Sequence, residues 1–154
     1  MILKATLQKG GSFTDHRGTL DFVNENTPGH YRRFYIITHP DTKVVRAWQG
    51  HQFEEKGFYA LGGSFVIAVV EPVNFKNPGE NETPMIFYIS AENKNFLRVP
   101  GGHYTGIKAL TPNSRLLVLS STDLSESKSD DYRLPAERWI NWDTVDTKNH
   151  SIEI

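Results

Sequence analysis

The chain has 154 residues, with 17 Lys and Arg against 18 Asp and Glu, so its formal net charge at pH 7 is -1. The length suits one domain with its own core, and the balanced charge excludes a nucleic-acid-binding arm or a polybasic membrane patch at the level of the whole chain. Cysteine is absent, which excludes disulfide scaffolds, thiolate metal sites and cysteine nucleophiles. Because no apolar run reaches the length of a signal peptide or a membrane span, we expect a cytoplasmic protein without membrane or nucleic-acid partners.

Short apolar or alternating segments, each closed by turn residues, predict eight strands. In chain order these are Thr19–Val23, Arg33–Thr38, Val44–Trp48, Gly57–Leu61, Ser64–Glu71, Met85–Ser90, Phe96–Val99 and Leu116–Ser120. The polar stretch Ser120–Asp131 is expected to be a mobile loop, and Pro135–Ile140 a short helix with proline in its first turn. The sequence therefore predicts a single all-β domain over residues 1–154, a jelly roll or small barrel whose inner face binds the ligand.

Two stretches resemble the motifs of the cupin family. Residues 49–62 read Gln-x-His-x3-Glu-x6-Gly, similar to the first cupin motif, and residues 100–105 read Pro-Gly-Gly-His-Tyr-Thr, similar to the second. In metal-binding cupins the ligands are three His and one Glu, whereas this sequence has Gln49 and Thr105 at two of the His positions. A divalent metal needs at least three good ligands. We therefore expect neither a metal nor another cofactor.

A closer resemblance is to two families of metal-independent cupins, the dTDP-4-dehydrorhamnose 3,5-epimerases and the dTDP-4-keto-6-deoxyglucose 3,4-ketoisomerases. The ordered segments that carry it are residues 15–20 (DHRGTL), 32–36 (RRFYI), 45–51 (VRAWQGH), 63–64 (GS) and 99–102 (VPGG). The resemblance covers about residues 13–132 and leaves 133–154 as a C-terminal extension. It implies a double-stranded β-helix, a homodimer and a substrate that is a nucleotide-linked 4-keto sugar.

The resemblance favours the ketoisomerases over the epimerases. Epimerases carry Arg-Gly-x-His-x-Gln, and the base of that motif is replaced here by Gln49, whose amide cannot accept a proton at accessible pH. Their tyrosine acid and second strand-end histidine correspond to Leu119 and Thr105. Ketoisomerases carry Arg-Gly-x-His-x-His, of which His51 matches the second histidine, and Tyr35 matches a tyrosine of their Lys-Arg-Val-Tyr run.

Moving a ketone to the neighbouring carbon requires a proton shuttle and donors for the developing oxyanion. The predicted catalytic residues are His51 as the shuttle, with Tyr35 and Gln49. The predicted substrate-binding residues are Arg17, Arg33, Arg46 and Lys56 for the diphosphate, Trp48 and Tyr59 for stacking, and His103. Each has a structural alternative: His51 as a hydrogen-bonded barrel-mouth residue, Arg17 as a turn residue paired with Asp15, residues 54–56 as a solvated charge cluster, and His103 as a turn residue.

Two further functions stay open. The first is a 3- or 3,5-epimerase that uses a rearranged base on the same substrate class. The second is a non-catalytic cupin that binds nucleotide sugars or carbohydrates and has lost its acid and base groups. Residues 137–143 resemble the closing segment of the epimerases, where an aspartate orients the catalytic histidine. Packing of Trp139 and Trp142 over one end of the barrel is the favoured role of this segment.

Overall fold

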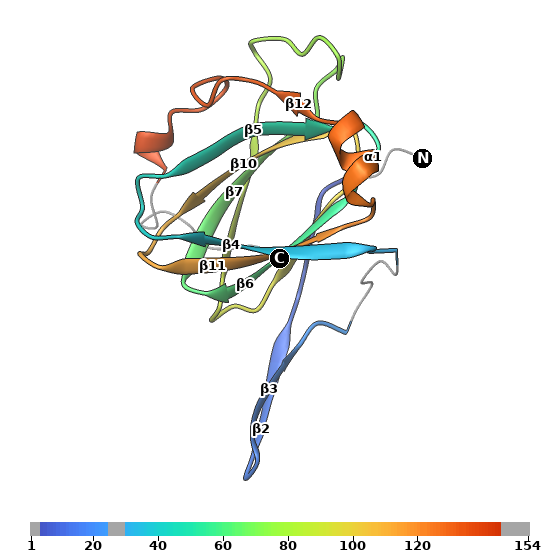
Figure 1. The fold of residues 1–154 in the computed structure, drawn as a ribbon. Helices are drawn as coiled ribbons and strands as arrows, with labels where there is room; N and C mark the ends of the chain where they lie inside the picture. Colours follow the sequence, from blue (N-terminus) through green and yellow to red (C-terminus); the bar gives the residue numbers. More distant parts are fainter. Residues whose placement is uncertain (1–3, 25–29, 146–154) are drawn as a thin grey trace.

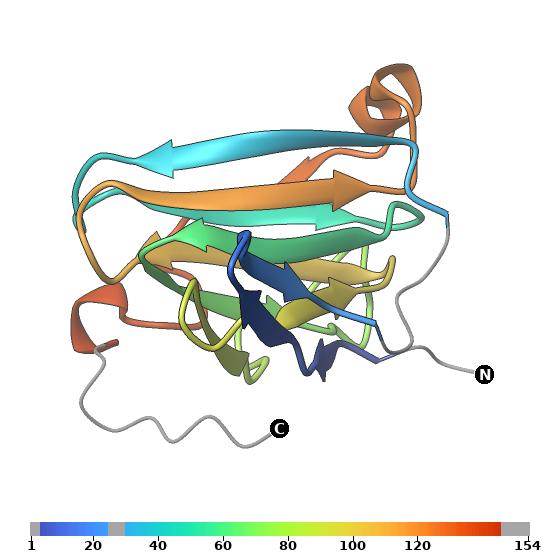
Figure 2. The same cartoon turned by 90° about the horizontal axis from the view of Figure 1, so that it is seen from below.

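The computed structural model describes residues 4–24 and 30–145. Within these residues the strands form two antiparallel five-stranded sheets that lie on each other as two layers, and a separate hairpin (Figures 1 and 2). The first sheet has the order β1 (Thr6–Gln8), β9 (Phe96–Val99), β6 (Lys56–Gly62), β11 (Ser114–Ser120) and β4 (Arg33–His39). The second has the order β12 (Tyr132–Arg133), β5 (Val45–His51), β10 (His103–Ala109), β7 (Ser64–Val70) and β8 (Met85–Ser90).

Strand β7 explains why the second sheet is covered on both faces. Its residues Phe65–Val70 are at most 1% exposed. Because side chains alternate along a strand, the odd-numbered residues join the core between the sheets, and the even-numbered ones join a second cluster on the opposite face. Each buried side chain of this size stabilises the fold by roughly 1.5–3 kcal/mol.

The second cluster is closed by the chain that follows β12. There Trp142, the first residue of the short 3-10 helix η1 (Trp142–Thr144), packs with its ring centroid 5.7 Å from that of Trp48. Its indole N–H donates to the Ala136 carbonyl oxygen at 2.7 Å. A Cβ atom on Gly106 of β10 would come within 2.5 Å of the Trp142 ring, so only glycine allows this close approach.

The hairpin of β2 (Gly11–Asp15) and β3 (Gly18–Phe22) projects away from the two layers (Figure 1). Its facing residues Phe13 and Leu20 are 59% and 60% exposed. Gly18 has a φ of 123°, a backbone conformation that allows the tight turn at its tip.

The eight predicted strands are confirmed, with ends that differ by at most a few residues. Strands β1, β2 and β10 and the two-residue β12 were not predicted. The strand β5 continues to His51 and β10 begins at His103, so both histidines lie on paired strands, directly opposite each other.

The expected loop at Ser120–Asp131 and the expected helix at Pro135–Ile140 were both wrong. The predicted loop contains the helix α1 (Leu124–Ser129), which begins with a capping box between Asp123 and Glu126. Conversely, Pro135–Ile140 forms turns, because Trp139 has a φ of 70° that breaks a helix. None of the helices in the described residues is long and apolar enough to cross a membrane.

Candidate active site

A pocket of about 590 Å³ lies between the two sheets. It is lined by residues of β4, β5, β6, β10 and β12, namely Tyr35, Ile36, Ile37, Thr38, Val45, Arg46, Ala47, Trp48, Gln49, Lys56, Phe58, Thr105, Ile107 and Arg133. Of the residues predicted to form the site, five are therefore brought together here: Tyr35, Arg46, Trp48, Gln49 and Lys56. Volumes of this order are typical of small-molecule sites.

Trp48 borders this pocket, but its ring points away from the pocket. The indole is 1% exposed, packs against Trp139 and Trp142 in the second cluster, and donates its N–H to the Arg138 carbonyl oxygen at 2.7 Å. Because Gln49 is the next residue along β5, its side chain points to the opposite face and reaches the pocket.

His51 lies beyond the large pocket, beside a chamber of about 10 Å³. This chamber is lined by Gln49, His51, Glu54, Lys56, Val99, Pro100, His103 and Thr105. Gln49, Lys56 and Thr105 line both spaces and so form the boundary between them. The Lys56 ammonium donates to Oε1 of Gln49 at 3.1 Å across this boundary.

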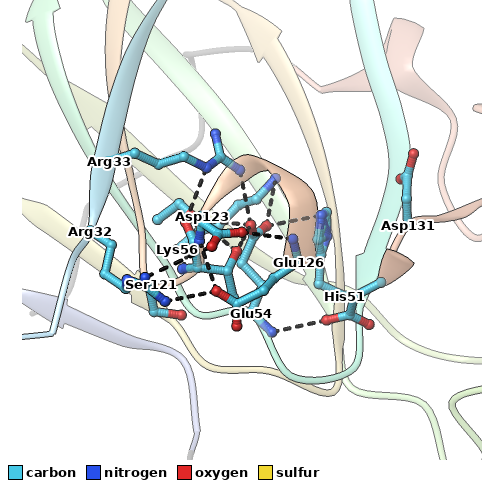
Figure 3. Close-up of polar contacts among 12 residues, drawn as sticks. Arg32, Arg33, His51, Glu54, Lys56, Ser121, Asp123, Glu126 and Asp131 are labelled. Carbon is cyan, nitrogen blue, oxygen red and sulfur yellow. Dashed lines mark hydrogen bonds and ion pairs between the residues drawn. The ribbon is translucent and has the colours of Figure 1, made fainter. Parts of the chain in front are cut away.

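A buried carboxylate, Glu54, joins the charged groups of the site (Figure 3). Its Oε1 atom accepts hydrogen bonds from Arg33 at 3.0 Å, from Ser120 at 2.7 Å and from Thr122 at 2.6 Å. Its Oε2 atom lies 2.9 Å from Nε2 of His51 and 3.7 Å from Nζ of Lys56. The approach to His51 is close, but the two atoms are not aligned as a hydrogen bond.

The pKa values reflect this arrangement. Burial raises the pKa of Glu54, but the hydrogen bonds from Thr122 and Ser120 and the charges of Lys56 and His51 outweigh burial and bring it to about 2. Burial lowers the pKa of Lys56 to about 8, despite the nearby Glu54 carboxylate. Burial and the Lys56 charge also lower the pKa of His51. The site thus contains an ionised carboxylate, a lysine that titrates closer to neutral pH than an exposed lysine does, and an imidazole whose neutral, proton-accepting form is favoured.

The segment before β12 fixes the loop that carries Glu54. The Asp130 carboxylate accepts hydrogen bonds from the backbone N–H groups of Gln52, Phe53 and Glu54 at 2.7, 2.8 and 3.1 Å. The next residue, Asp131, accepts from the amide of Gln49 at 3.2 Å and from Arg133 at 2.8 Å.

Tyr35 faces the large pocket from β4. Its ring stacks beneath the Arg33 guanidinium, whose central carbon is 5.4 Å from the ring centroid. Burial and the Glu54 charge raise the pKa of Tyr35, so its phenol keeps its proton at neutral pH. Arg33 donates to Glu54 and, at 3.1 Å, to the Thr122 carbonyl oxygen, which holds its guanidinium inside the protein network.

Three predicted residues lie elsewhere or have other contacts. Arg17 is at the hairpin tip, where it pairs with Asp15 at 2.7 Å and has a 77% exposed side chain. Tyr59 lies on the outer face of β6, since its neighbour Phe58 faces the pocket. His103 is buried, and its Nδ1–H donates to the carbonyl oxygens of residues 100 and 101 at 2.9 and 3.1 Å, because a carbonyl can only accept.

Sequence reasoning missed Glu54 as a member of the site, together with Ser120, Thr122, Asp130 and Arg133. One feature of the sequence indicates that a glutamate is buried here. Adjacent side chains of an extended chain point to opposite sides, so Glu54 and Glu55 cannot both face solvent where the segment enters a strand. Glu55 pairs with Arg98 at 2.7 Å instead.

A metal site receives no support from the described residues, in which no group of three or more His, Asp or Glu side chains is placed to hold an ion. Gln49 and Thr105 are directly opposite each other on β5 and β10. They occupy the positions at which the resemblance to metal-binding cupins would require histidines. The expected lack of a metal or cofactor stays a prediction.

Known structures share this fold. The chain is similar to a histidine-to-asparagine mutant of the 3,4-ketoisomerase QdtA from Thermoanaerobacterium thermosaccharolyticum in complex with TDP-4-keto-6-deoxyglucose. The TM-score is 0.68, and the identity is 21% over 87% of this chain and 90% of that one. It is also similar to a dTDP sugar isomerase from Desulfovibrio desulfuricans, with a TM-score of 0.71 and 16% identity over 92% of both chains.

A third similar structure is the dTDP-4-dehydrorhamnose 3,5-epimerase from Bacillus anthracis with TDP and pyrophosphate bound. Its TM-score is 0.70 and its identity 17%, over 84% of this chain and 78% of that one. No protein-family model and no curated protein sequence matches the chain. These likenesses establish the predicted class of fold, an all-β jelly roll of the cupin type.

Proposed function

We propose that the protein is an isomerase of a nucleotide-linked 4-keto-6-deoxy sugar, of the 3,4-ketoisomerase type. The observation that carries this proposal is the group of His51, Glu54 and Lys56 next to a pocket of about 590 Å³. The site combines two bases, a fixed carboxylate and a protonated phenol, which are the groups that proton transfer beside a ketone requires. The shared fold with nucleotide-sugar isomerases and epimerases supports the same substrate class.

The two arginines of the pocket bind the diphosphate in this proposal. Arg46 and Arg133 both line the pocket, and guanidinium groups suit phosphate oxygens because they donate in a planar fork. Arg33 serves a different role, since its donors are already directed to Glu54 and Thr122.

In the proposed reaction His51 takes the proton from C3 of the 4-keto sugar, which leaves an enediolate across C3 and C4. The imidazolium exchanges this proton with solvent and delivers a solvent-derived proton to C4, while the C3 hydroxyl loses its proton and the C4 oxygen gains one, so the ketone moves to C3. No oxidant or reductant is needed. Tyr35 and Lys56 donate hydrogen bonds to the enediolate oxygens.

The boundary between the two spaces has a role in this reaction. His51 borders the small chamber, and the Lys56–Gln49 hydrogen bond lies between it and the large pocket. In the proposal the sugar oxygens replace Gln49 as partners of Lys56 when substrate binds, which brings the reacting carbons to the imidazole. Gln49 is then a second donor to the sugar.

Incubation with dTDP-4-keto-6-deoxyglucose in deuterated water tests the reaction. A ketoisomerase places deuterium at C4 of a 3-keto product and, by the reverse reaction, at C3 of the remaining substrate. Label at C3 or C5 without formation of any 3-keto product would identify an epimerase. This alternative is supported by the 3,5-epimerase fold, which matches the chain as closely as the ketoisomerase fold does.

A binding function without catalysis is the other alternative. It is favoured by the position of His51 behind Gln49 and Lys56. If calorimetry detects binding of the nucleotide sugar and none of its sugar protons exchanges, the result would support this binding function and contradict the isomerase.

The proposal includes a homodimer. Phe34 and Ile36, on the outer side of the edge strand β4, are 67% and 43% exposed, and Phe13 and Leu20 on the projecting hairpin are exposed as well. Apolar side chains gathered on a sheet edge and a hairpin are typical of a surface that another chain covers. Since the hairpin points away from its own pocket, Arg17 would bind substrate in the pocket of the second copy.

A further inference from the structure

We propose that Glu54 is a positioning residue of the active site, which holds the imidazole of His51 in one orientation and stabilises its protonated form. This inference rests on the proposed function of His51 as the proton shuttle. It assigns a role to a residue that does not line the large pocket.

One oxygen of the Glu54 carboxylate is fixed by hydrogen bonds, and the other is free to interact with His51. Three donors hold Oε1, the guanidinium of Arg33 from β4 and the hydroxyls of Ser120 and Thr122 at the end of β11. Oε2 receives no hydrogen bond and faces Nε2 of His51 at 2.9 Å. A carboxylate held in this way cannot turn away when the imidazole gains a proton, so its charge stays beside that proton.

The backbone adds a second constraint. Asp130 accepts three successive N–H groups of residues 52–54, which fixes the loop between His51 and Glu54. The backbone between His51 and Glu54 is therefore fixed, which limits how far the two side chains can move apart. Figure 3 shows Glu54 directed toward His51 and Lys56 from this loop.

The titratable groups that face His51 come from four parts of the chain. Glu54 and Lys56 lie on the loop after β5 and on β6, Asp130 and Asp131 precede β12, and the buried His103 is the cross-strand neighbour on β10. Asp130 is engaged with the backbone, so Glu54 is the carboxylate in closest contact with the ring. Removal of the Glu54 charge would leave the positive charge of Lys56 beside an imidazole that has lost its nearest counter-charge, which disfavours the imidazolium.

The orientation also decides which ring nitrogen reacts. When Nε2 carries hydrogen and faces the carboxylate, Nδ1 is left with the lone pair that accepts a proton.

The test begins without substrate, by an NMR pH titration of the imidazole of His51, assigned with His51→Asn. Glu54→Gln removes the charge and keeps the shape, and we expect the midpoint of His51 to fall by about one pH unit or more. Glu55→Gln is the matched control: it makes the same change one residue along the chain, on a carboxylate paired with Arg98, and leaves the midpoint unchanged. Glu54→Asp retains the charge and returns the midpoint toward that of the wild type.

The second readout is the pH profile of deuterium exchange into the nucleotide sugar. In Glu54→Gln we expect a rate lower by roughly tenfold or more, with the acidic limb of the profile displaced by the same shift as the NMR midpoint. A wild-type midpoint in folded Glu54→Gln contradicts the inference. If that variant does not fold, the ¹⁵N shifts of wild-type His51 decide: hydrogen on Nε2 supports the pairing, and hydrogen on Nδ1 overturns it.

The two proposals fail separately. If the wild-type protein exchanges no sugar proton while the NMR midpoint still depends on Glu54, the proposed function fails and the His51–Glu54 pairing stands. If exchange occurs and the midpoint does not depend on Glu54, the isomerase stands and the role of Glu54 is wrong.

Discussion

Glu54 and Glu55 are neighbours in the sequence, but they have separate sets of partners. Glu54 is 2% exposed and contacts Arg33, His51 and Lys56, whereas Glu55 forms an ion pair with Arg98. A pair of carboxylates followed by a lysine suggests a solvated charge cluster, and only the alternation of the extended chain separates their roles.

The depressed pKa of Glu54 has a consequence for stability against acid. A carboxyl whose pKa falls from 4.5 to about 2 on folding contributes stability that is present above pH 4.5 and is lost as the pH falls toward 2. A shift of this size corresponds to the order of 3 kcal/mol. We therefore expect Glu54→Gln to lower the free energy of unfolding at pH 7 by a similar amount. The difference in free energy of unfolding between this variant and the wild type should become smaller as the pH falls below 4.5.

Urea unfolding of the wild type and of Glu54→Gln at a series of pH values between 7 and 2 measures this dependence. Glu55→Gln again serves as the control. A difference between Glu54→Gln and the wild type that stays constant over this range would show that Glu54 is not ionised in a stabilising network.

At the scale of elements, the strands were the most predictable feature. Apolar runs such as Ser64–Val70 and Met85–Ser90 can be recognised as strands from their composition and from the turn residues on either side. The strand β10 was missed because its sequence, HYTGIKA, contains a glycine and no continuous apolar run. The glycine at position 106 is explained chiefly by the close approach of Trp142, which is 36 residues away in the sequence.

The candidate site was predictable only where local sequence motifs indicate its residues. Local motifs pointed to Tyr35, Arg46, Gln49 and Lys56, and the structure places all four on one pocket. The contacts of Glu54 depend on side chains from β4, β11 and the loop after β11, which no local pattern relates to each other. The helix α1 was missed because the polar composition of its segment concealed the capping pair of Asp123 and Glu126.

The contact between β10 and the closing segment gives a prediction at this scale. Gly106→Ala places a methyl group about 2.5 Å from the Trp142 ring, and overpacking of this kind costs roughly 1–3 kcal/mol. We expect the free energy of unfolding to fall by that amount in urea titrations. Gly62→Ala is the matched control, because a Cβ atom there meets nothing within 4 Å, and its effect should be small. Equal effects of the two substitutions would contradict the packing described for Trp142.

The whole molecule presents a surface that the single chain leaves uncovered. The first sheet ends at β4, with Phe34 and Ile36 exposed on its outer side, and the hairpin extends away from both layers. An isolated two-stranded hairpin is marginally stable in water. A second copy that covers these elements would explain how they keep their structure.

We therefore predict a particle of twice the 17.5 kDa chain mass by light scattering coupled to gel filtration. Phe34→Glu places a charge on the exposed outer side of β4 and should shift the protein toward the monomer. The control is Val73→Glu, at a loop position that is 97% exposed, which should leave the mass unchanged. A wild-type particle with the mass of one chain would contradict the dimer.

The central claim is that this chain moves a ketone between neighbouring carbons of a nucleotide-linked sugar with His51 as the proton shuttle. The most direct measurement follows deuterium and ketone position in dTDP-4-keto-6-deoxyglucose by NMR, for the wild type and for His51→Ala, with binding of dTDP measured in parallel by calorimetry. We predict a 3-keto product labelled at C4 with the wild type, and for His51→Ala the loss of exchange with dTDP binding retained. Unchanged turnover in His51→Ala, or no exchange by the wild type, would contradict the claim.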